Sequence, residues 1–206
     1  LTFHEDFANE GKLLKEKLTA WYGLEVVSEA PVTIVMDYLS DRKKAVNEEY
    51  YELCIDGQQI RISAATPHGV FNGTQTLLGL LKGQESPFRL EAMSIQDYPD
   101  LLYRGQMLDI ARNYTTVDNL KKLIDMLSSY KLNVLQFHEK DWLYPAYDGG
   151  YDPYAATSGN GYYTREEFID LLRYAAERHV QVIPEIESPG HARAAIVAMN
   201  VRYKKY

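Results

Sequence analysis

Two stretches of the chain decide its fold: residues 103–114, YRGQMLDIARNY, and residues 180–194, VQVIPEIESPGHARA. Each is a short strand-like run that ends in ionisable residues. In βα-barrel enzymes the interior of the barrel is filled, so the catalytic groups lie just past the carboxyl ends of the strands. We therefore expect function at the strand tips, which carry the ionisable residues Arg104, Asp109, His138, Glu185, Glu187 and His191.

The second half of the chain alternates strand and helix patterns. Strands are predicted at residues 103–110, 132–138 and 180–186. Thr115 or Thr116 is expected to cap the first helix, and Thr164 and Glu167 to form a capping box at the start of the second. The inward face of this second helix is predicted to carry Phe168, Leu171, Leu172 and Ala175. A third helix is predicted at residues 191–202.

Repeated βα units predict a parallel sheet covered by helices, and their lengths fit a barrel. We interpret the second half as the first three βα units of a TIM (β/α)8 barrel. Because a full barrel takes about 250 residues, five further units would follow Tyr206.

The first half has mixed patterns that predict a small α+β domain. Helices are predicted at residues 9–22 and 68–81, and strands at residues 32–36 and 88–95. A hairpin is predicted from residues 50–55 and 59–63, which flank Asp56-Gly57, a pair that readily adopts a tight turn. Cys54, the only cysteine, lies in an apolar run and is expected to be buried.

Composition excludes several classes of partner. The net charge of −7 and the pI of about 5.3 argue against nucleic acid, which demands a basic face. No apolar run approaches the roughly 18 residues that span a bilayer. A lone cysteine cannot form an internal disulfide, so cysteine content does not indicate a compartment.

The motifs RG-x-x-LD-x-x-R and PEI-x-x-PGH occur in order, and with the segment between them they resemble glycoside hydrolase family 20, the β-N-acetylhexosaminidases. This resemblance covers roughly residues 100 to 200. The preceding segment, RISAATPHGVFNGTQTLLGLL, resembles the non-catalytic α/β domain of the same family. The resemblance thus implies a non-catalytic domain at residues 1–99 and a partial catalytic barrel at residues 100–206.

The family removes terminal β-linked N-acetylhexosamine from glycans, and the acetamido oxygen of the substrate acts as the nucleophile. The resemblance implies a glycan substrate, no metal and no organic cofactor. It places the catalytic Asp-Glu pair at the end of a fourth strand, beyond Tyr206, so this chain alone is expected to be inactive. One departure is that His138 runs directly into Glu139, where the family has two consecutive aspartates. We interpret this as a loop missing from the sequence, which a peptide spanning the junction would disprove.

The resemblance also implies roles for individual residues. Arg104 is expected to bind the 3- and 4-hydroxyls of the sugar, and His138 to contact the substrate as well. His191 is expected to support the general acid. From their positions at the end of the first strand, Asp109 and Arg112 are predicted to form an ion pair with each other and not to contact the sugar. Glu187 is predicted to support the site without touching the sugar.

Two alternatives remain open. The first is a metal-dependent barrel hydrolase whose ligands are His138, Glu185 or Glu187, and His191, since zinc and manganese accept imidazole and carboxylate. The second is a glycan-binding protein without catalytic carboxylates. Three βα units would also leave an open sheet edge, which predicts either further chain or an oligomer. The resemblance to bacterial members of the family suggests export.

Overall fold

The computed structural model describes residues 1–27, 29–110, 113–138 and 163–185, with Gly190, Ile196, Met199, Asn200, Tyr203 and Lys204 as single positions. The chain folds as two compact units, Leu1–Leu102 and Tyr103–Tyr206. The helix predicted at residues 191–202 and the junction after His138 lie outside the described residues. None of the helices that the structure describes is long and apolar enough to cross a membrane.

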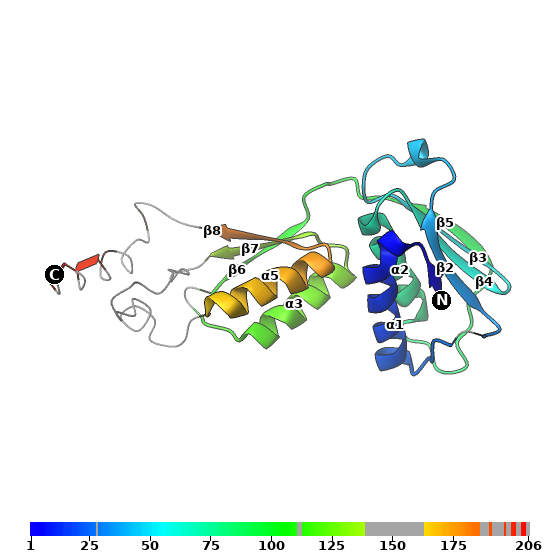
Figure 1. Ribbon diagram of the computed structural model, residues 1–206, viewed down its shortest axis with the longest axis horizontal. Coiled ribbons are helices and arrows are strands. Elements are labelled where there is room, and N and C mark those ends of the chain that lie inside the picture. Colours follow the sequence, from blue (N-terminus) through cyan, green and yellow to red (C-terminus); the bar gives the residue numbers. More distant parts are fainter. Residues whose placement is uncertain are drawn as a thin grey trace. The chain divides into compact units, whose positions relative to one another are not determined.

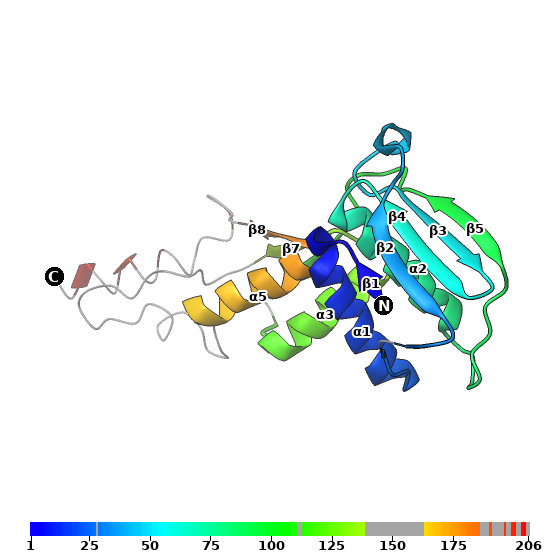
Figure 2. The same ribbon diagram turned by 45° about the vertical axis from the view of Figure 1, so that its right-hand side comes forward.

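The first unit is a five-stranded mixed sheet with two α-helices on one face (Figure 1). Its elements are β1 (Thr2–Phe3), the 3₁₀ turn Glu5–Phe7, α1 (Ala8–Tyr22), β2 (Thr33–Tyr38), the 3₁₀ turn Arg42–Lys44, β3 (Tyr51–Asp56), β4 (Gln59–Ala64), α2 (Pro67–Leu81) and β5 (Met93–Asp97). The strand order is β1-β2-β4-β3-β5, and Figure 2 shows β2, β4, β3 and β5 side by side. The first three strands in this order run parallel, whereas β3 is antiparallel to both of its neighbours. The predicted hairpin is therefore confirmed, and Gly57 adopts a positive φ of 44° in its turn.

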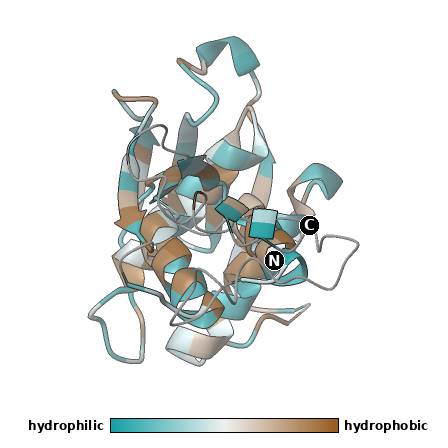
Figure 3. Ribbon diagram, turned by 90° about the vertical axis from the view of Figure 1, so that its left-hand side faces the viewer, coloured by the Kyte–Doolittle hydropathy of each residue, from teal (hydrophilic) through white to brown (hydrophobic). Residues whose placement is uncertain are grey.

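Alternation along the strands decides which side chains enter the core of this unit. Tyr51, Leu53 and Ile55 of β3 are buried, whereas Cys54 between them is exposed. The prediction that Cys54 is buried is therefore wrong, because successive side chains of a strand point to opposite faces of the sheet. In Figure 3 the helices carry bands of hydrophobic residues beside hydrophilic ones, as expected for helices packed on one side.

Helix α2 lies very close to the sheet. Thr66 caps its first turn by accepting a hydrogen bond from the amide of Gly69. A methyl group on Gly69 would come within 2.5 Å of the Tyr50 carbonyl oxygen, and one on Gly73 within 2.5 Å of Ile62. Glycine at these two positions is what permits the close approach.

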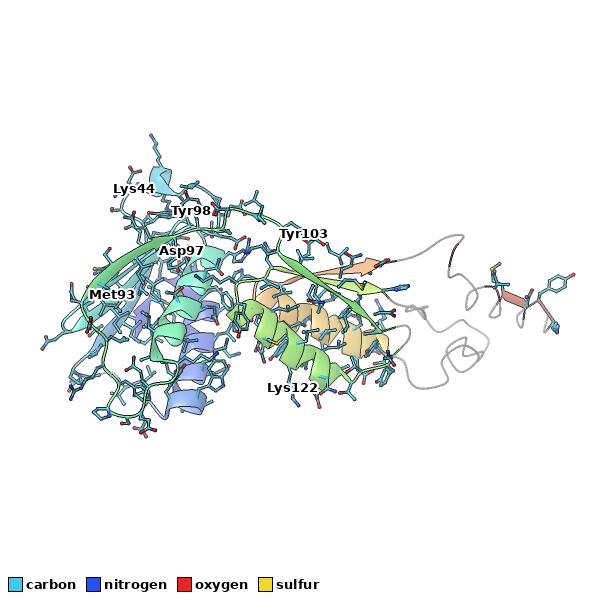
Figure 4. The ribbon with its side chains drawn as sticks, turned by 180° about the vertical axis from the view of Figure 1, so that it is seen from behind. Lys44, Met93, Asp97, Tyr98, Tyr103 and Lys122 are labelled. Carbon is cyan, nitrogen blue, oxygen red and sulfur yellow. The ribbon has the colours of Figure 1, made fainter. Side chains whose placement is uncertain are left out.

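The strand predicted at residues 88–95 begins later than expected. Strand β5 starts at Met93 and ends at Asp97, as the labels in Figure 4 mark. Before it, the amide of Arg89 donates to the Gln84 side chain and the ring of Phe88 packs edge-on against Tyr22. These local contacts take the place of strand pairing, so the prediction was wrong for residues 88–92.

The second unit contains a three-stranded parallel sheet in the order β6-β7-β8. Its elements are β6 (Gly105–Asp109), α3 (Val117–Ser129), β7 (Val134–His138), α5 (Arg165–Glu177) and β8 (Gln181–Glu185). Thr116 caps α3, and Thr164 and Glu167 form the predicted capping box of α5. Lys122 lies exposed on α3 (Figure 4).

Helices α3 and α5 cover one face of this sheet (Figure 1). The core between them includes Leu120 and Ile124 of α3, Leu135 and Phe137 of β7, and Phe168 of α5. Leu172 was predicted to face inward as well, but it is 38% exposed. It lies one position after Leu171, about 100° further around the helix, and so leaves the buried face.

Candidate active site

The three parallel strands of the second unit each end in an ionisable residue. Asp109, His138 and Glu185 are the last residues of β6, β7 and β8, and they are register partners across the sheet. Leu135 and Phe137 are fully buried against the helices, so the alternating His138 points to the opposite face. Register partners in a parallel sheet share a face, so all three side chains line the carboxyl edge on the side away from the helices.

Asp109 and His138 form a close pair at this edge. The carboxylate Oδ2 of Asp109 lies 3.7 Å from Nδ1 of His138, and the two side chains are only 21% and 12% exposed. A carboxylate beside Nδ1 orients the imidazole and leaves Nε2 as the nitrogen for another partner. The predicted partner of Asp109, Arg112, lies outside the described residues.

Sequence reasoning missed Gln136. This residue precedes His138 by two positions on β7, and its side-chain amide donates a hydrogen bond of 2.8 Å to Oε2 of Glu185. A polar side chain at an alternating position between the apolar Leu135 and Phe137 was the signal that could have revealed it. The site therefore contains a second side-chain contact, on the strand pair β7 and β8.

Arg104 does not lie at the carboxyl edge. It precedes β6, its backbone amide donates to Oδ1 of Asn133 at 3.0 Å, and its Nε donates to the Lys131 carbonyl oxygen at 2.8 Å. Asp109 follows five residues later, a distance of about 17 Å along an extended strand. Arg104 was grouped with the strand tips, and that placement is wrong, because it lies at the amino end of β6, where the strand predicted at residues 103–110 also begins.

Two tyrosines lie on the segments that adjoin this edge. Tyr114 follows β6, and its ring stacks on that of Tyr163, which precedes α5, with the ring centres 5.3 Å apart. Tyr163 is buried, and its hydroxyl donates to the Thr115 carbonyl oxygen at 2.6 Å. This contact fixes the chain that leaves β6 against the start of α5.

Glu187 and His191 lie outside the described residues, as Arg112 does. Among the residues that the structure describes, no three His, Cys, Asp or Glu side chains are grouped so that they could hold a metal ion. The described part of the edge thus offers two carboxylates, one imidazole and one amide, which can bind hydroxyl and amide groups of a polar ligand and exchange protons with it.

Comparison with known proteins identifies both halves of the chain. Residues 101–206 match the catalytic domain of glycosyl hydrolase family 20, and residues 2–98 match domain 2 of that family. The chain is 31% identical to the N,N'-diacetylchitobiase of Vibrio harveyi, with 89% of the chain and 24% of that protein covered. It is 34% identical to a beta-hexosaminidase of Porphyromonas gingivalis, with 94% and 28% covered.

Solved structures agree with these sequence matches. The β-N-acetylhexosaminidase of Streptomyces coelicolor superposes with a TM-score of 0.81 at 29% identity, and the match covers 96% of this chain and 43% of that one. The chain spans about a quarter of the length of the curated relatives named above. It belongs to glycosyl hydrolase family 20.

Proposed function

We propose that the protein containing this chain is a β-N-acetylhexosaminidase, which hydrolyses terminal β-linked N-acetylhexosamine from glycans. The observation that carries this proposal is the row of Asp109, His138 and Glu185 at the carboxyl edge of a parallel sheet whose sequence matches the family's catalytic domain. Barrel enzymes bind substrate at this edge.

The proposed architecture extends the described sheet. Strands β6, β7 and β8 would be the first three strands of a (β/α)8 barrel, which would place the three edge residues at the mouth of the barrel. Residues 1–99 would form the non-catalytic domain and residues 100–206 the opening of the catalytic domain. From the sequence we also expect an exported protein in which either further chain or an oligomer covers the open sheet edge.

The proposed chemistry is substrate-assisted. The acetamido oxygen of the sugar would attack the anomeric carbon, so that no residue of the protein becomes covalently attached. Two carboxyl groups would serve this step, one polarising the acetamido group and one protonating the leaving oxygen. The resemblance places both beyond Tyr206, so we expect the 206-residue chain alone to be inactive. No metal and no organic cofactor is required by this route.

The roles of the edge residues follow from their positions. His138 would contact the sugar through Nε2 while Asp109 holds its Nδ1 side. Arg112 follows Asp109 by three residues in the sequence, so we assign the sugar hydroxyls to Arg112 in place of Arg104. A guanidinium suits two adjacent hydroxyls because its donors form a planar fork. His191 would support the general acid, and Glu187 would support the site without touching the sugar.

The test is an assay of the full-length protein on aryl β-N-acetylglucosaminide and aryl β-N-acetylgalactosaminide. Both are candidates for cleavage, whereas the matching aryl β-glucoside, which lacks the acetamido group, should be cleaved at least about a hundredfold more slowly because the internal nucleophile is absent. A protein that is inert on both acetamido substrates would refute the proposal.

The same assay separates the two alternatives. A protein that binds N-acetylglucosamine but cleaves neither substrate would be a glycan-binding protein. Activity that disappears on treatment with a chelator and returns with zinc or manganese would indicate a metal-dependent hydrolase.

A further inference from the structure

Gln136 lies directly behind the catalytic edge and on the same face of the sheet as His138. The alternation of β7 places Leu135 and Phe137 in the helix-covered core, so Gln136 and His138 point to the other side. The Gln136 amide donates to Oε2 of Glu185 at 2.8 Å, and both side chains are partly buried. Glu185 is in turn the register partner of His138.

The strand register places His138 between Asp109 and Glu185, which lie on the two neighbouring strands. Parallel strands lie about 4.8 Å apart, so Asp109 on one side and Glu185 on the other both adjoin His138. Oδ2 of Asp109 lies 3.7 Å from Nδ1 of the imidazole, within ion-pair distance. The Glu185 side chain has several rotamers available, and a hydrogen bond from an amide to its charged carboxylate favours the rotamer that makes it.

We propose that Gln136 is a positioning residue, which fixes the Glu185 carboxylate and through it the setting of the His138 ring. The inference rests on the proposed function, in which His138 contacts the sugar. Gln136 itself does not touch the substrate. Its effect should therefore appear in the rate of the chemical step more than in substrate binding, because small misplacements of a contacting group reduce the rate strongly.

The experiment uses the full-length protein and three single variants. Gln136→Met keeps the length of the side chain but removes its N–H donors, and Gln136→Glu places a second carboxylate against Glu185. Gln106→Met is the matched control, because Gln106 lies on the neighbouring strand and its side-chain amide donates to the backbone oxygen of Met107 and not to a carboxylate of the edge. For Gln136→Met we expect kcat to fall about 10-fold to 100-fold with KM changed less than about 3-fold.

The Gln136→Glu variant tests the chemistry of the contact. Two carboxylates at hydrogen-bond distance repel each other, so we expect kcat to fall further than in Gln136→Met. The control should keep kcat and KM within about 2-fold of the wild type. Equal kcat values in the wild type and in both Gln136 variants would overturn the inference, as would a loss confined to KM.

A double-variant cycle with Glu185→Gln shows whether Gln136 acts through Glu185. If it does, the Gln136→Met/Glu185→Gln variant should lose no more kcat and no more Tm than Glu185→Gln alone. Additive losses would overturn the inference. The Tm cycle does not depend on activity. A wild-type protein that is inert on both substrates would refute the proposed function and, with it, the catalytic role of Gln136. Non-additive Tm values would still establish the contact between Gln136 and Glu185 in that case.

Discussion

Arg104 and Arg112 stand eight positions apart, and strand β6 lies between them in the chain. Because the carboxyl edge binds substrate in barrel enzymes, Arg112→Ala should lower kcat/KM by about 100-fold in the full-length protein. Arg104→Ala should leave kcat/KM within about 3-fold but lower the free energy of unfolding by about 1–3 kcal/mol, since it removes the donor to the Lys131 carbonyl oxygen. Steady-state kinetics and urea unfolding measure both effects. A large loss of activity in a folded Arg104→Ala protein would restore the assignment made from the sequence.

Tyr174 should give the protein a specific alkaline instability. Burial, and then the hydrogen bond to Asp125, raise the pKa of the Tyr174 hydroxyl above its ordinary value of 10. Below pH 10 the hydroxyl keeps its proton in both states. Above pH 10 the unfolded chain loses this proton while the folded protein retains it, so the free energy of unfolding falls as the pH rises. The stability advantage of the wild type over Tyr174→Phe should therefore narrow above pH 10.

Urea unfolding of the wild type and Tyr174→Phe between pH 8 and pH 11 measures how the difference in their unfolding free energies changes with pH. Tyr130→Phe serves as the control, because the Tyr130 side chain is 66% exposed and the substitution is the same. A difference between wild type and Tyr174→Phe that stays constant over this range would show that the hydroxyl titrates alike in the folded and unfolded protein.

Helices α3 and α5 are joined by two ion pairs that differ in burial. Asp125 of α3 accepts from Nε of Arg178 at 2.6 Å and from the Tyr174 hydroxyl at 2.6 Å, and Arg178 stacks on the Tyr174 ring. Lys121 and Asp170 form the second pair, in which Asp170 is 62% exposed. Asp125→Ala should cost about 1–3 kcal/mol of unfolding free energy because it leaves the buried Arg178 without this acceptor. Asp170→Ala should cost less than about 1 kcal/mol.

Chemical denaturation of the two alanine variants provides the comparison. Both substitutions place alanine in a helix, so the gain in helix propensity is similar and largely cancels. Equal losses in the two variants would mean that burial does not set the strength of these pairs.

The sequence predicted elements well where the signal was local. The apolar spacing and the Thr164–Glu167 capping box predicted α5, and Asp56-Gly57 predicted the hairpin, because both depend on residues a few positions apart. The contacts within the candidate site were harder to predict from the sequence. The Gln136 to Glu185 bond joins two strands that are 49 positions apart, and no periodicity along one strand reveals such a partner. Arg104 was misplaced for a different reason: it was grouped with the strand tips although the predicted strand already put it at the amino end.

Across the whole chain, the two units have separate hydrophobic cores. The first core draws on residues between Phe7 and Leu81 with neighbours up to Ile95, and the second on residues between Ile110 and Val180. No residue that the structure describes belongs to both core clusters. A unit with its own core can fold by itself, so the family's domain 2 and catalytic domain need not depend on each other for their cores.

The two units should therefore behave differently when they are produced separately. Residues 1–102 have a hydrophobic core of their own and should show a single cooperative thermal transition by near-ultraviolet circular dichroism. Residues 103–206 should associate, because within the described residues β6 and β8 each pair on one side only and Met107 is 51% exposed on the face away from the helices. Light scattering on a size-exclusion column would detect dimers or larger species. A monomeric second unit with a sharp thermal transition would mean that its own residues cover its sheet edge and open face. The expectation that further strands or another subunit cover them would then be wrong.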